Sequence, residues 1–350
     1  MEMSNVKISI VIPVYGVEQY IGQMLDSIQA QTYQDFEVIF VDDGSPDNCP
    51  KILDDFCRLD ERYTVIHQKN SGVSIARNTG MAQARGEYLY LADSDDWLTE
   101  NAMERLAQAA EETNADIIYG DWYAESSGAS SKRVCFEHEF VTEDPDTIFS
   151  MQYAVTNIYK VKIRRPEFKV IYYFGGAPWR YMVKRSIVEE NELSFDPTVK
   201  GLGDDILFAL HVYEYVKKAA YIQTPIYHYR IIEGTYTRGY KSDLLEKYSI
   251  TLSRMQQFIS DYSKGEDTKK SFYIRTILYF DDAMNRYFKN ENNPKNSKEL
   301  FAEMKDTLRK EPYRTAVKKA PLKDFGFNRL YIRFMLLRLH FYRLYWLRVV

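Results

Sequence analysis

Hydrophobic residues in the first 120 positions of this 350-residue chain fall into two alternating patterns. Short continuous apolar runs, which are typical of buried strands, occupy residues 7–14, 36–41, 64–67, 88–92 and 117–119. The segments between them carry apolar residues at helical spacing and predict helices over 17–31, 50–58, 74–84 and 100–113. Strands that alternate with helices predict an α/β fold, in which a mostly parallel sheet has helices on both faces.

The pattern becomes less regular after residue 123. A Ser/Gly-rich stretch at 125–132 predicts an exposed loop, and 148–165 fits neither pattern clearly. Helical spacing returns at 179–190 and 205–216, and 220–229 has the composition of a strand. From residue 242 onward, long helical segments dominate: 244–261, 271–290 and 297–309. We therefore predict two parts, an α/β domain over 1–241 and a helical C-terminal region over 242–350.

Aspartates follow two of the predicted strands. Asp42 and Asp43 follow one strand, and the triplet Asp93-Ser94-Asp95 follows another. Open α/β sheets bind their ligands at the carboxyl ends of strands. Carboxylates at such an edge can hold a divalent cation, and the cation can hold a diphosphate. This arrangement predicts a site for a nucleotide-activated substrate.

The triplet Asp93-Ser94-Asp95 has two interpretations, a metal site and a local turn or cap. Side chains alternate along a strand, so Asp93 and Asp95 project to the same side and can address one Mg²⁺ or Mn²⁺. Asp and Ser also favour Asx-turns and helix N-caps, and Asp96 is the better candidate for capping. The residues alone leave both interpretations open.

Composition and charge argue against several classes of protein. A formal net charge of −4 gives no global basic character, so we expect no nucleic-acid partner. Three cysteines without metal-type spacing indicate a reducing compartment. We expect no signal peptide, and no apolar run is long enough to predict a transmembrane helix.

Four motifs occur in order and together resemble the family 2 glycosyltransferases, which have a GT-A fold. They are residues 10–15 (Ile-Val-Ile-Pro-Val-Tyr), 41–45 (Val-Asp-Asp-Gly-Ser), 74–80 (Ser-Ile-Ala-Arg-Asn-Thr-Gly) and 93–96 (Asp-Ser-Asp-Asp). The resemblance covers residues 7–120, with weaker similarity to about residue 240. It implies a nucleotide-sugar donor and a Mn²⁺ or Mg²⁺ cofactor.

The resemblance assigns most donor contacts to the strand ends. Asp95 would be the metal ligand, and Asp93 would lie near the ribose or the metal. Asp42, more than Asp43, would contact the base, although both could instead form a plain turn. Arg77 would contact the nucleotide, although a helical Arg ordinarily forms a surface salt bridge. The full donor set is Pro13, Val14, Tyr15, Asp42, Asp43, Arg77, Asp93 and Ser94.

The catalytic base follows a glycine-containing loop in this family. Here Gly203 precedes Asp204 and Asp205, and Asp204 departs from the usual Glu. We assign Asp205 as the base, although either carboxylate could cap the helix that follows. On the acceptor side we expect Asp204, Trp179 and His228. A buried core position is the alternative for Trp179, and a structural role is the alternative for His228.

The last residues are rich in arginine. Residues 327–350 contain Arg329, Arg333, Arg338, Arg343 and Arg348 and no acidic residue. On a helical wheel all but Arg338 fall within roughly 140°. This predicts one basic amphipathic helix that binds the membrane interface. A terminal helix packed on the catalytic domain or on a dimer partner is the alternative.

Together these features predict a metal-dependent, inverting glycosyltransferase at the cytoplasmic face of a membrane. Its donor would be a UDP-sugar and its acceptor a glycan or lipid-linked glycan, and a homodimer is possible. One alternative is a non-catalytic sugar-nucleotide-binding subunit of a glycan-assembly complex. A second is a nucleotidyltransferase, although the glycine-rich, Lys/Arg-bearing loop expected after the first strand is missing. A dehydrogenase is disfavoured because G-x-G-x-x-G is absent there.

Overall fold

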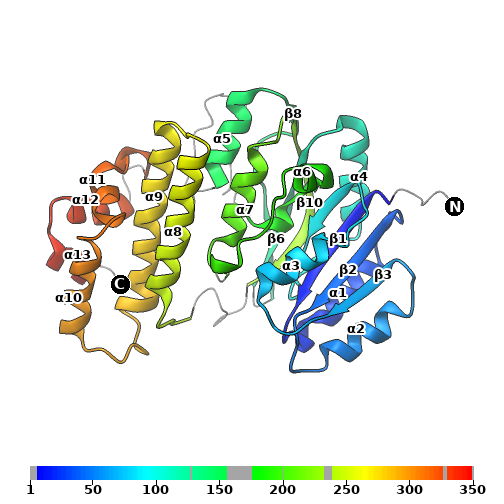
Figure 1. Cartoon of the computed structure of the whole chain (residues 1–350), viewed down its shortest axis with the longest axis horizontal. Helices are drawn as coiled ribbons and strands as arrows, with labels where there is room; N and C mark the ends of the chain where they lie inside the picture. The colour runs from blue at the N-terminus through cyan, green and yellow to red at the C-terminus, as the bar shows by residue number, and fades with distance from the viewer. Residues whose placement is uncertain are drawn as a thin grey trace. The chain divides into compact units, whose positions relative to one another are not determined.

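The computed structural model describes residues 6–126, 128–155, 176–199, 201–231, 239–325 and 329–348 (Figure 1). The chain divides into two compact units. The first unit ends at Ile231, and the described residues from 239 onward belong to the second.

The first unit is built on a mixed sheet, which confirms the predicted fold class. Its order is β3-β2-β1-β4-β9-β6-β10-β5, with β7 paired to β6 and β8 paired to β10. The strands within the described residues are β1 (Ile8–Val14), β2 (Phe36–Asp42), β3 (Tyr63–His67), β4 (Tyr88–Leu91), β5 (Trp97–Leu98), β6 (Ile117–Ser126), β7 (Ala129–Arg133), β8 (Phe140–Thr142), β9 (Tyr181–Lys184) and β10 (Ala219–Arg230).

The half formed by β3, β2, β1 and β4 is parallel. Every residue of β1 and β2 is buried, which explains their continuous apolar sequences. The register sets Val14 beside Asp42 and Asp42 beside His67. The carboxyl ends of these strands therefore meet at one edge of the sheet, as the sequence predicted.

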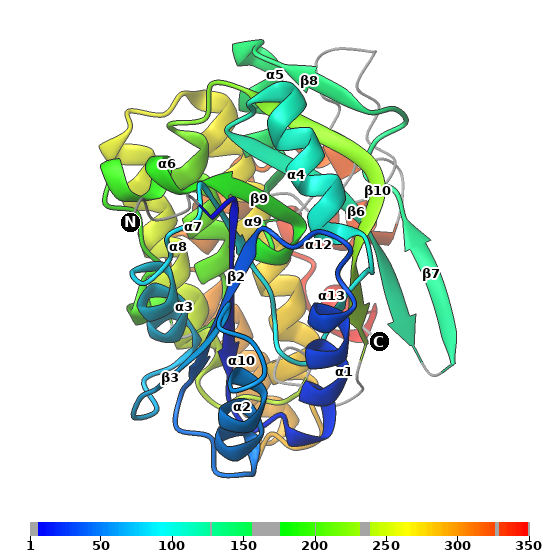
Figure 2. The same ribbon diagram turned by 90° about the vertical axis from the view of Figure 1, so that its right-hand side faces the viewer.

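Helices cover both faces of this sheet. Figures 1 and 2 show α3, α6 and α7 on one face and α1 and α4 on the other. Contact between α3 and the sheet requires a glycine, because a Cβ on Gly80 would lie 2.4 Å from Val11 Cγ1. The helices are α1 (Glu18–Gln29), α2 (Cys49–Cys57), α3 (Val73–Met81), α4 (Ala102–Thr113), α5 (Pro145–Val155), α6 (Arg185–Glu190) and α7 (Asp204–Tyr213).

Two segments differ from expectation. The helix predicted over 179–190 is a 3₁₀ turn (Pro178–Arg180), then β9, then the short α6. β9 runs antiparallel between β4 and β6, and a short apolar run of this kind fits a buried strand as well as a helix. The loop predicted over 125–132 is the hairpin of β6 and β7 (Figure 2). Most side chains of β7 are exposed, so the strand has a polar sequence without the apolar pattern that predicts a strand.

The second unit is helical. Its helices are α8 (Leu244–Asp261), α9 (Glu266–Ala283) with a π-helical turn (Met284–Phe288), α10 (Ser297–Thr307), α11 (Tyr313–Lys319), a 3₁₀ turn (Leu322–Phe325), α12 (Arg329–Arg338) and α13 (Tyr342–Arg348). A capping box starts α10, in which Asn296 and Glu299 satisfy each other's backbone N–H groups. Among the described residues, no helix is both long enough and apolar enough to cross a membrane.

The single helix expected over 327–350 is wrong. The chain leaves α12 through His340, whose φ of +61° is left-handed. The N–H of Phe341 donates to Leu336 O, and that of His340 donates to Leu337 O, which is the Schellman pattern that ends helices. The sequence concealed this end because the left-handed position holds His rather than Gly. The arginines of the predicted arc therefore do not share one helical face.

Candidate functional site

Asp42 lies at the carboxyl end of β2, where other groups hold its carboxylate in place. Its Oδ1 accepts a hydrogen bond from Ser45 N at 2.9 Å, and its Oδ2 lies 2.8 Å from His67 Nδ1. His67 Nε2 lies 3.2 Å from Asp54 Oδ1, so the ring bridges two carboxylates. These carboxylates raise the pKa of His67, with the hydrogen bond to Asp42 as the largest cause.

Asp43 has a different set of contacts. Its carboxylate accepts hydrogen bonds from Gln68 Nε2 at 2.7 Å and from the backbone N–H groups of Ser71 and Gly72 at 2.8 Å. Gly72 is the residue before α3. Asp43 thus fixes the loop that leads into α3.

The end of β1 completes this edge. Pro13 and Val14 are buried within the strand, and Val14 O accepts a hydrogen bond from Asp43 N at 2.9 Å. Tyr15, the next residue, is 52% exposed. The exposed ring therefore lies at the sheet edge that also carries Asp42.

Residues 93–96 form a tight acidic loop after β4. Asp93 N donates to the Tyr227 hydroxyl at 2.9 Å, and Arg230 donates from Nε to Asp95 O at 2.8 Å and from its backbone N to Asp96 Oδ1 at 2.7 Å. Ser94 is buried. Strand β10 thus fixes the loop through Tyr227 and Arg230.

Burial changes the acidity of this loop. Burial and then the nearby charge of Asp93 raise the pKa of Asp95 to about 6. Burial, with the charges of Asp95 and Asp93, also raises the pKa of Asp96 well above its usual range. Crowded, partly desolvated carboxylates bind protons tightly and would gain from a cationic partner.

Arg77 connects the acidic loop to α7. Its Nη2 donates to Asp93 Oδ1 at 2.8 Å, and its Nη1 lies 3.4 Å from Asp204 Oδ2. The guanidinium is buried, with its carbon 5.1 Å from the centre of the Phe195 ring. Arg77 is therefore not the surface salt bridge that the sequence also allowed, because it joins two segments 111 residues apart in the chain.

The two aspartates at the start of α7 have different environments. Asp204 is buried, and its Oδ2 accepts a hydrogen bond from Ser74 Oγ at 2.9 Å as well as facing Arg77. Asp205 is less buried, and its Oδ1 accepts from Ile206 N at 2.8 Å. Gly203, with φ of +97°, turns the chain into the helix. Asp204 therefore supports the site, and Asp205 is the more accessible carboxylate.

Trp179 lies in an aromatic cluster and is 4% exposed. It stacks on Tyr227 at 4.6 Å and on Tyr229 at 5.4 Å between ring centres, and it meets Trp122 edge to face at 5.7 Å. This burial matches the core alternative, and a sugar-stacking role for Trp179 stays a prediction.

His228 is stacked between two aromatic rings. Trp97 lies 4.8 Å and Tyr123 4.9 Å from it between ring centres, and its Nδ1 lies 2.7 Å from Glu125 Oε1. Since Arg230 also packs over Trp97, at 4.7 Å, His228 supports the strand that fixes the acidic loop. Its acceptor role stays a prediction.

The sequence analysis missed three contributors to the site: His67, Ser74 and Tyr227. His67 could have been found from the strand order, because it ends the strand next to Asp42. Ser74 stands in the motif that carries Arg77, but its partner Asp204 is 130 residues away. No local signal marks Tyr227, whose hydroxyl meets a loop 134 residues earlier in the chain.

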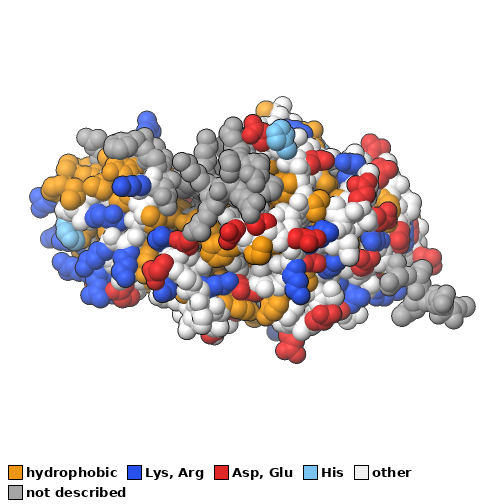
Figure 3. All heavy atoms as spheres, turned by 90° about the horizontal axis from the view of Figure 1, so that it is seen from above, with side chains coloured by type: hydrophobic (Ala, Val, Ile, Leu, Met, Phe, Trp, Pro, Cys, Tyr) orange, Lys and Arg blue, Asp and Glu red, His pale blue; other side chains and the backbone are white. Residues whose placement is uncertain are grey.

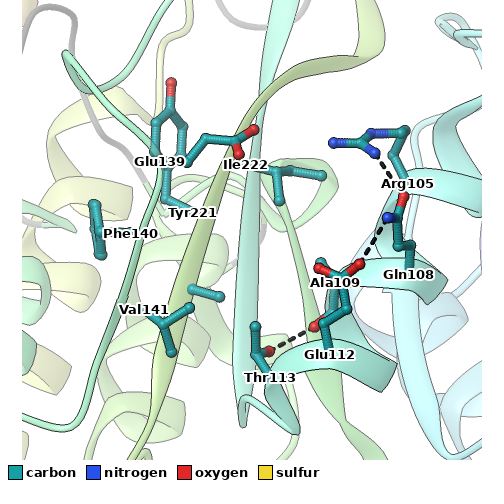
Figure 4. Close-up of a pocket in the computed structure, with 11 residues that line it drawn as sticks. Arg105, Gln108, Ala109, Glu112, Thr113, Glu139, Phe140, Val141, Tyr221 and Ile222 are labelled. Atoms are coloured by element: carbon teal, nitrogen blue, oxygen red, sulfur yellow. Dashed lines mark hydrogen bonds between the residues drawn. The ribbon is translucent and has the colours of Figure 1, made fainter.

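A groove of about 250 Å³ lies elsewhere on the first unit, between α4, β8 and β10 (Figure 4). Along one wall Arg105 donates to Gln108 at 2.6 Å, and Gln108 donates to Glu112 at 2.7 Å. The β10 residues in the groove, 220–222, begin that strand, whereas Arg230 ends it beside the acidic loop. The groove is therefore separate from the acidic site.

Comparison with known proteins agrees with this geometry. Residues 9–174 match the family described as Glycosyl transferase family 2. The chain is 28% identical over 311 residues to the putative glycosyltransferase EpsH of Bacillus subtilis, covering 87% of this chain and 83% of EpsH. It is 33% identical over 232 residues to glycosyltransferase GlyA of Streptococcus pneumoniae, covering 66% of this chain and only 32% of GlyA.

Solved structures share the fold. The crystal structure of S. aureus TarS 1-349 in complex with UDP-GlcNAc has a TM-score of 0.66 and 17% identity, and the match covers 98% of this chain and 90% of that one. At this identity the likeness concerns the fold alone. The family match and the glycosyltransferase relatives agree with the four motifs and with the GT-A-type fold, and residues 9–174 form a glycosyltransferase family 2 domain.

Proposed function

We propose that this enzyme transfers a sugar from a UDP-sugar to a hydroxyl group of a glycan or lipid-linked glycan, with inversion at the anomeric carbon. One observation carries the proposal: Arg77 contacts both Asp93 after β4 and Asp204 at the start of α7. The candidate donor residues and the candidate base Asp205 are thereby held in one site. The choice of UDP is supported by TarS, a neighbour in fold whose structure contains UDP-GlcNAc.

The donor base would lie at the ends of β1 and β2. Asp42 would accept the ring N–H of uracil, because each carboxylate oxygen has lone pairs beyond those used by Ser45 and His67. The backbone around Pro13 and Val14 and the exposed ring of Tyr15 would flank the base. Ser94 and Asp93 would lie toward the ribose.

The residues present fit Mn²⁺ or Mg²⁺. Both are hard cations that prefer carboxylate oxygens, and Mg²⁺ is commonly bound by one or two carboxylates together with substrate phosphates. Asp95 is largely buried beside the charge of Asp93, and a cation would relieve this crowding of carboxylates. Asp95, with Asp93 beside it, would hold the cation. When bound, it would neutralise the diphosphate and help UDP to leave.

The transfer itself would be a single displacement. Asp205 would take the proton from the acceptor hydroxyl while the oxygen of that hydroxyl bonds to the anomeric carbon. The bond from the anomeric carbon to the diphosphate oxygen would break in the same step, which inverts the configuration. Arg77 and Asp204 would hold the acidic loop and the first turn of α7 in fixed positions relative to each other.

The proposed class of acceptor is based on the names of two relatives. One, 29% identical over 229 residues, is named poly(ribitol-phosphate) beta-glucosyltransferase. The other, 23% identical over 283 residues, is named cholesterol galactosyltransferase. They are named for a polymer and for a lipid, so we place the acceptor among cell-surface glycans carried on a lipid or polymer. The reaction would then take place at the cytoplasmic face of the membrane.

Steady-state kinetics of Asp205→Asn test the catalytic assignment. Removing the base should lower the turnover number by about 10²–10⁴-fold while the KM for the UDP-sugar changes little, since the donor contacts remain. Asp55→Asn is the matched control, because Asp55 is exposed on α2 and pairs only with nearby Arg58 among the described residues. An Asp205→Asn enzyme that turns over like the control would overturn the assignment.

A further inference from the structure

Exposed hydrophobic side chains are concentrated near the C-terminal end of the second unit. Of the eight large hydrophobic side chains exposed in the described part of the chain, five lie between residues 332 and 347. Their exposed fractions run from 48% for Leu344 to 71% for Leu347. We call these five the apolar C-terminal face: Ile332, Leu339, Phe341, Leu344 and Leu347.

The five side chains come from two adjacent helices and the turn between them. Ile332 of α12 and Leu339, the residue that follows α12, are two helical turns apart and so lie on the same side. Leu344 and Leu347 are one turn apart on α13, which packs against α12. Phe341 lies in the turn. Figure 3 shows hydrophobic side chains gathered at the left of the view beside Lys and Arg side chains.

The other side of these helices is firmly packed. Phe334, Leu337 and Tyr345 are almost fully buried, and Trp346 meets Phe301 edge to face at 5.5 Å between ring centres. Arg333 of α12 pairs with Asp281 of α9 at 2.6 Å. The packing holds the apolar C-terminal face outward as part of a folded unit.

The surroundings of this face are strongly basic. Residues 312–350 contain nine Lys or Arg and a single acidic residue, Asp324. The exposed basic side chains among the described residues of this stretch include Lys318, Lys319, Lys323, Arg329 and Arg343. Apolar side chains rimmed by cations are suited to a phospholipid interface that carries negative charge.

We propose that the apolar C-terminal face binds an anionic phospholipid membrane. The leucines and Phe341 would enter the interface, and the lysines and arginines would contact lipid phosphates. A second copy of the chain is the poorer fit, because a two-fold contact would set the same basic side chains against one another. The proposal differs from the arginine-lined helix expected from the sequence, since Arg333 is paired internally and Arg338 donates to the carbonyls of Val317 and Ala320.

This inference deepens the proposed function, because a lipid-linked acceptor would be presented at the same surface. Its test needs neither donor nor acceptor. The full chain is mixed with vesicles of phosphatidylglycerol and phosphatidylcholine, or of phosphatidylcholine alone, and the bound fraction is measured by sedimentation. The test variant is the double substitution Leu344→Glu and Leu347→Glu. The control is Leu59→Glu, which changes a leucine that is 68% exposed in the first unit.

We expect the wild type and Leu59→Glu to sediment with the anionic vesicles and to be released by salt. The double variant should bind them on the order of tenfold more weakly or worse, because two charges replace inserted apolar groups. A far-UV circular dichroism spectrum like that of the wild type shows that the double variant is folded, since UDP binding reports only on the first unit. Failure of the wild type to bind UDP would count against the proposed function alone. Wild-type protein that ignores anionic vesicles would overturn the inference. So would a wild-type dimer that the double variant dissociates into monomers without any effect of lipid.

Discussion

His67 makes the surroundings of Asp42, the residue proposed to contact the uracil base, dependent on pH. It lies between Asp42 and Asp54, and these carboxylates raise its pKa above the ordinary value of 6.5. A histidine whose folded pKa is raised stabilises the fold fully below its unfolded pKa. That stabilisation is lost as the pH rises through the raised value.

The variant His67→Gln tests this at the residue scale. It should melt below the wild type by about 1–3 °C near pH 6, and the difference should shrink toward pH 8 as the wild-type ring loses its proton. Thermal unfolding followed by circular dichroism across this range measures both proteins. His138→Gln, which changes an exposed histidine outside this bridge, is the control. A deficit of His67→Gln that stays constant with pH would contradict the charged bridge.

Residue types that carry chemistry could be predicted from the sequence, whereas their environments could not. Asp42 ends one parallel strand and Asp93 comes after another, close to where each was expected, because a strand and its end are local features. Trp179 and His228 are held in aromatic stacks, and these stacks depend on strands distant in the sequence. The pairing of Ser74 with Asp204 is likewise a contact that no local spacing reveals.

At the scale of elements, α3 and its close approach to the sheet position Arg77. Gly80 makes this approach possible, since an added Cβ would lie 2.4 Å from Val11 Cγ1 and 3.2 Å from Val41 Cγ2. Both valines belong to buried strands and have little room to move. The distance between the helix and the sheet therefore sets where Arg77 meets Asp93.

Gly80→Ala should destabilise the first unit by about 1–3 kcal/mol, the usual effect of overpacking. Gly22→Ala is the matched change, because Gly22 lies inside α1 and its added Cβ would have no neighbour within 4 Å. We expect Gly22→Ala to stabilise by about 0.5–1 kcal/mol, since alanine favours a helix. Chemical denaturation measures both variants. Equal effects of the two substitutions would contradict the close packing of α3.

Elements with a strong pattern could be predicted, and those without one could not. The buried strands β1 and β2 and the long helix α8 match expectation because their patterns are continuous. β9 was missed because four residues carry too little periodicity to separate strand from helix. The end of α12 was missed because His340 adopts a conformation that usually marks glycine.

At the scale of the whole molecule, the two units carry different chemistry. The acidic strand ends and α7 belong to the first unit, and the basic stretch with the apolar C-terminal face belongs to the second. The formal net charge of −4 does not reveal this division, because it sums the charges of both units. This division is what the proposal of an acceptor presented at a charged surface would require.

Equilibrium binding of UDP and GDP, measured by calorimetry with and without Mn²⁺, tests the central claim most directly. The account predicts that UDP binds more tightly than GDP and that Mn²⁺ strengthens UDP binding. In Asp95→Asn the gain from Mn²⁺ should fall by on the order of tenfold, because the proposed ligand is lost, while Asp55→Asn should behave like the wild type. A wild-type protein that binds no UDP with either Mn²⁺ or Mg²⁺, or an Asp95→Asn variant with an undiminished response to Mn²⁺, would contradict the account.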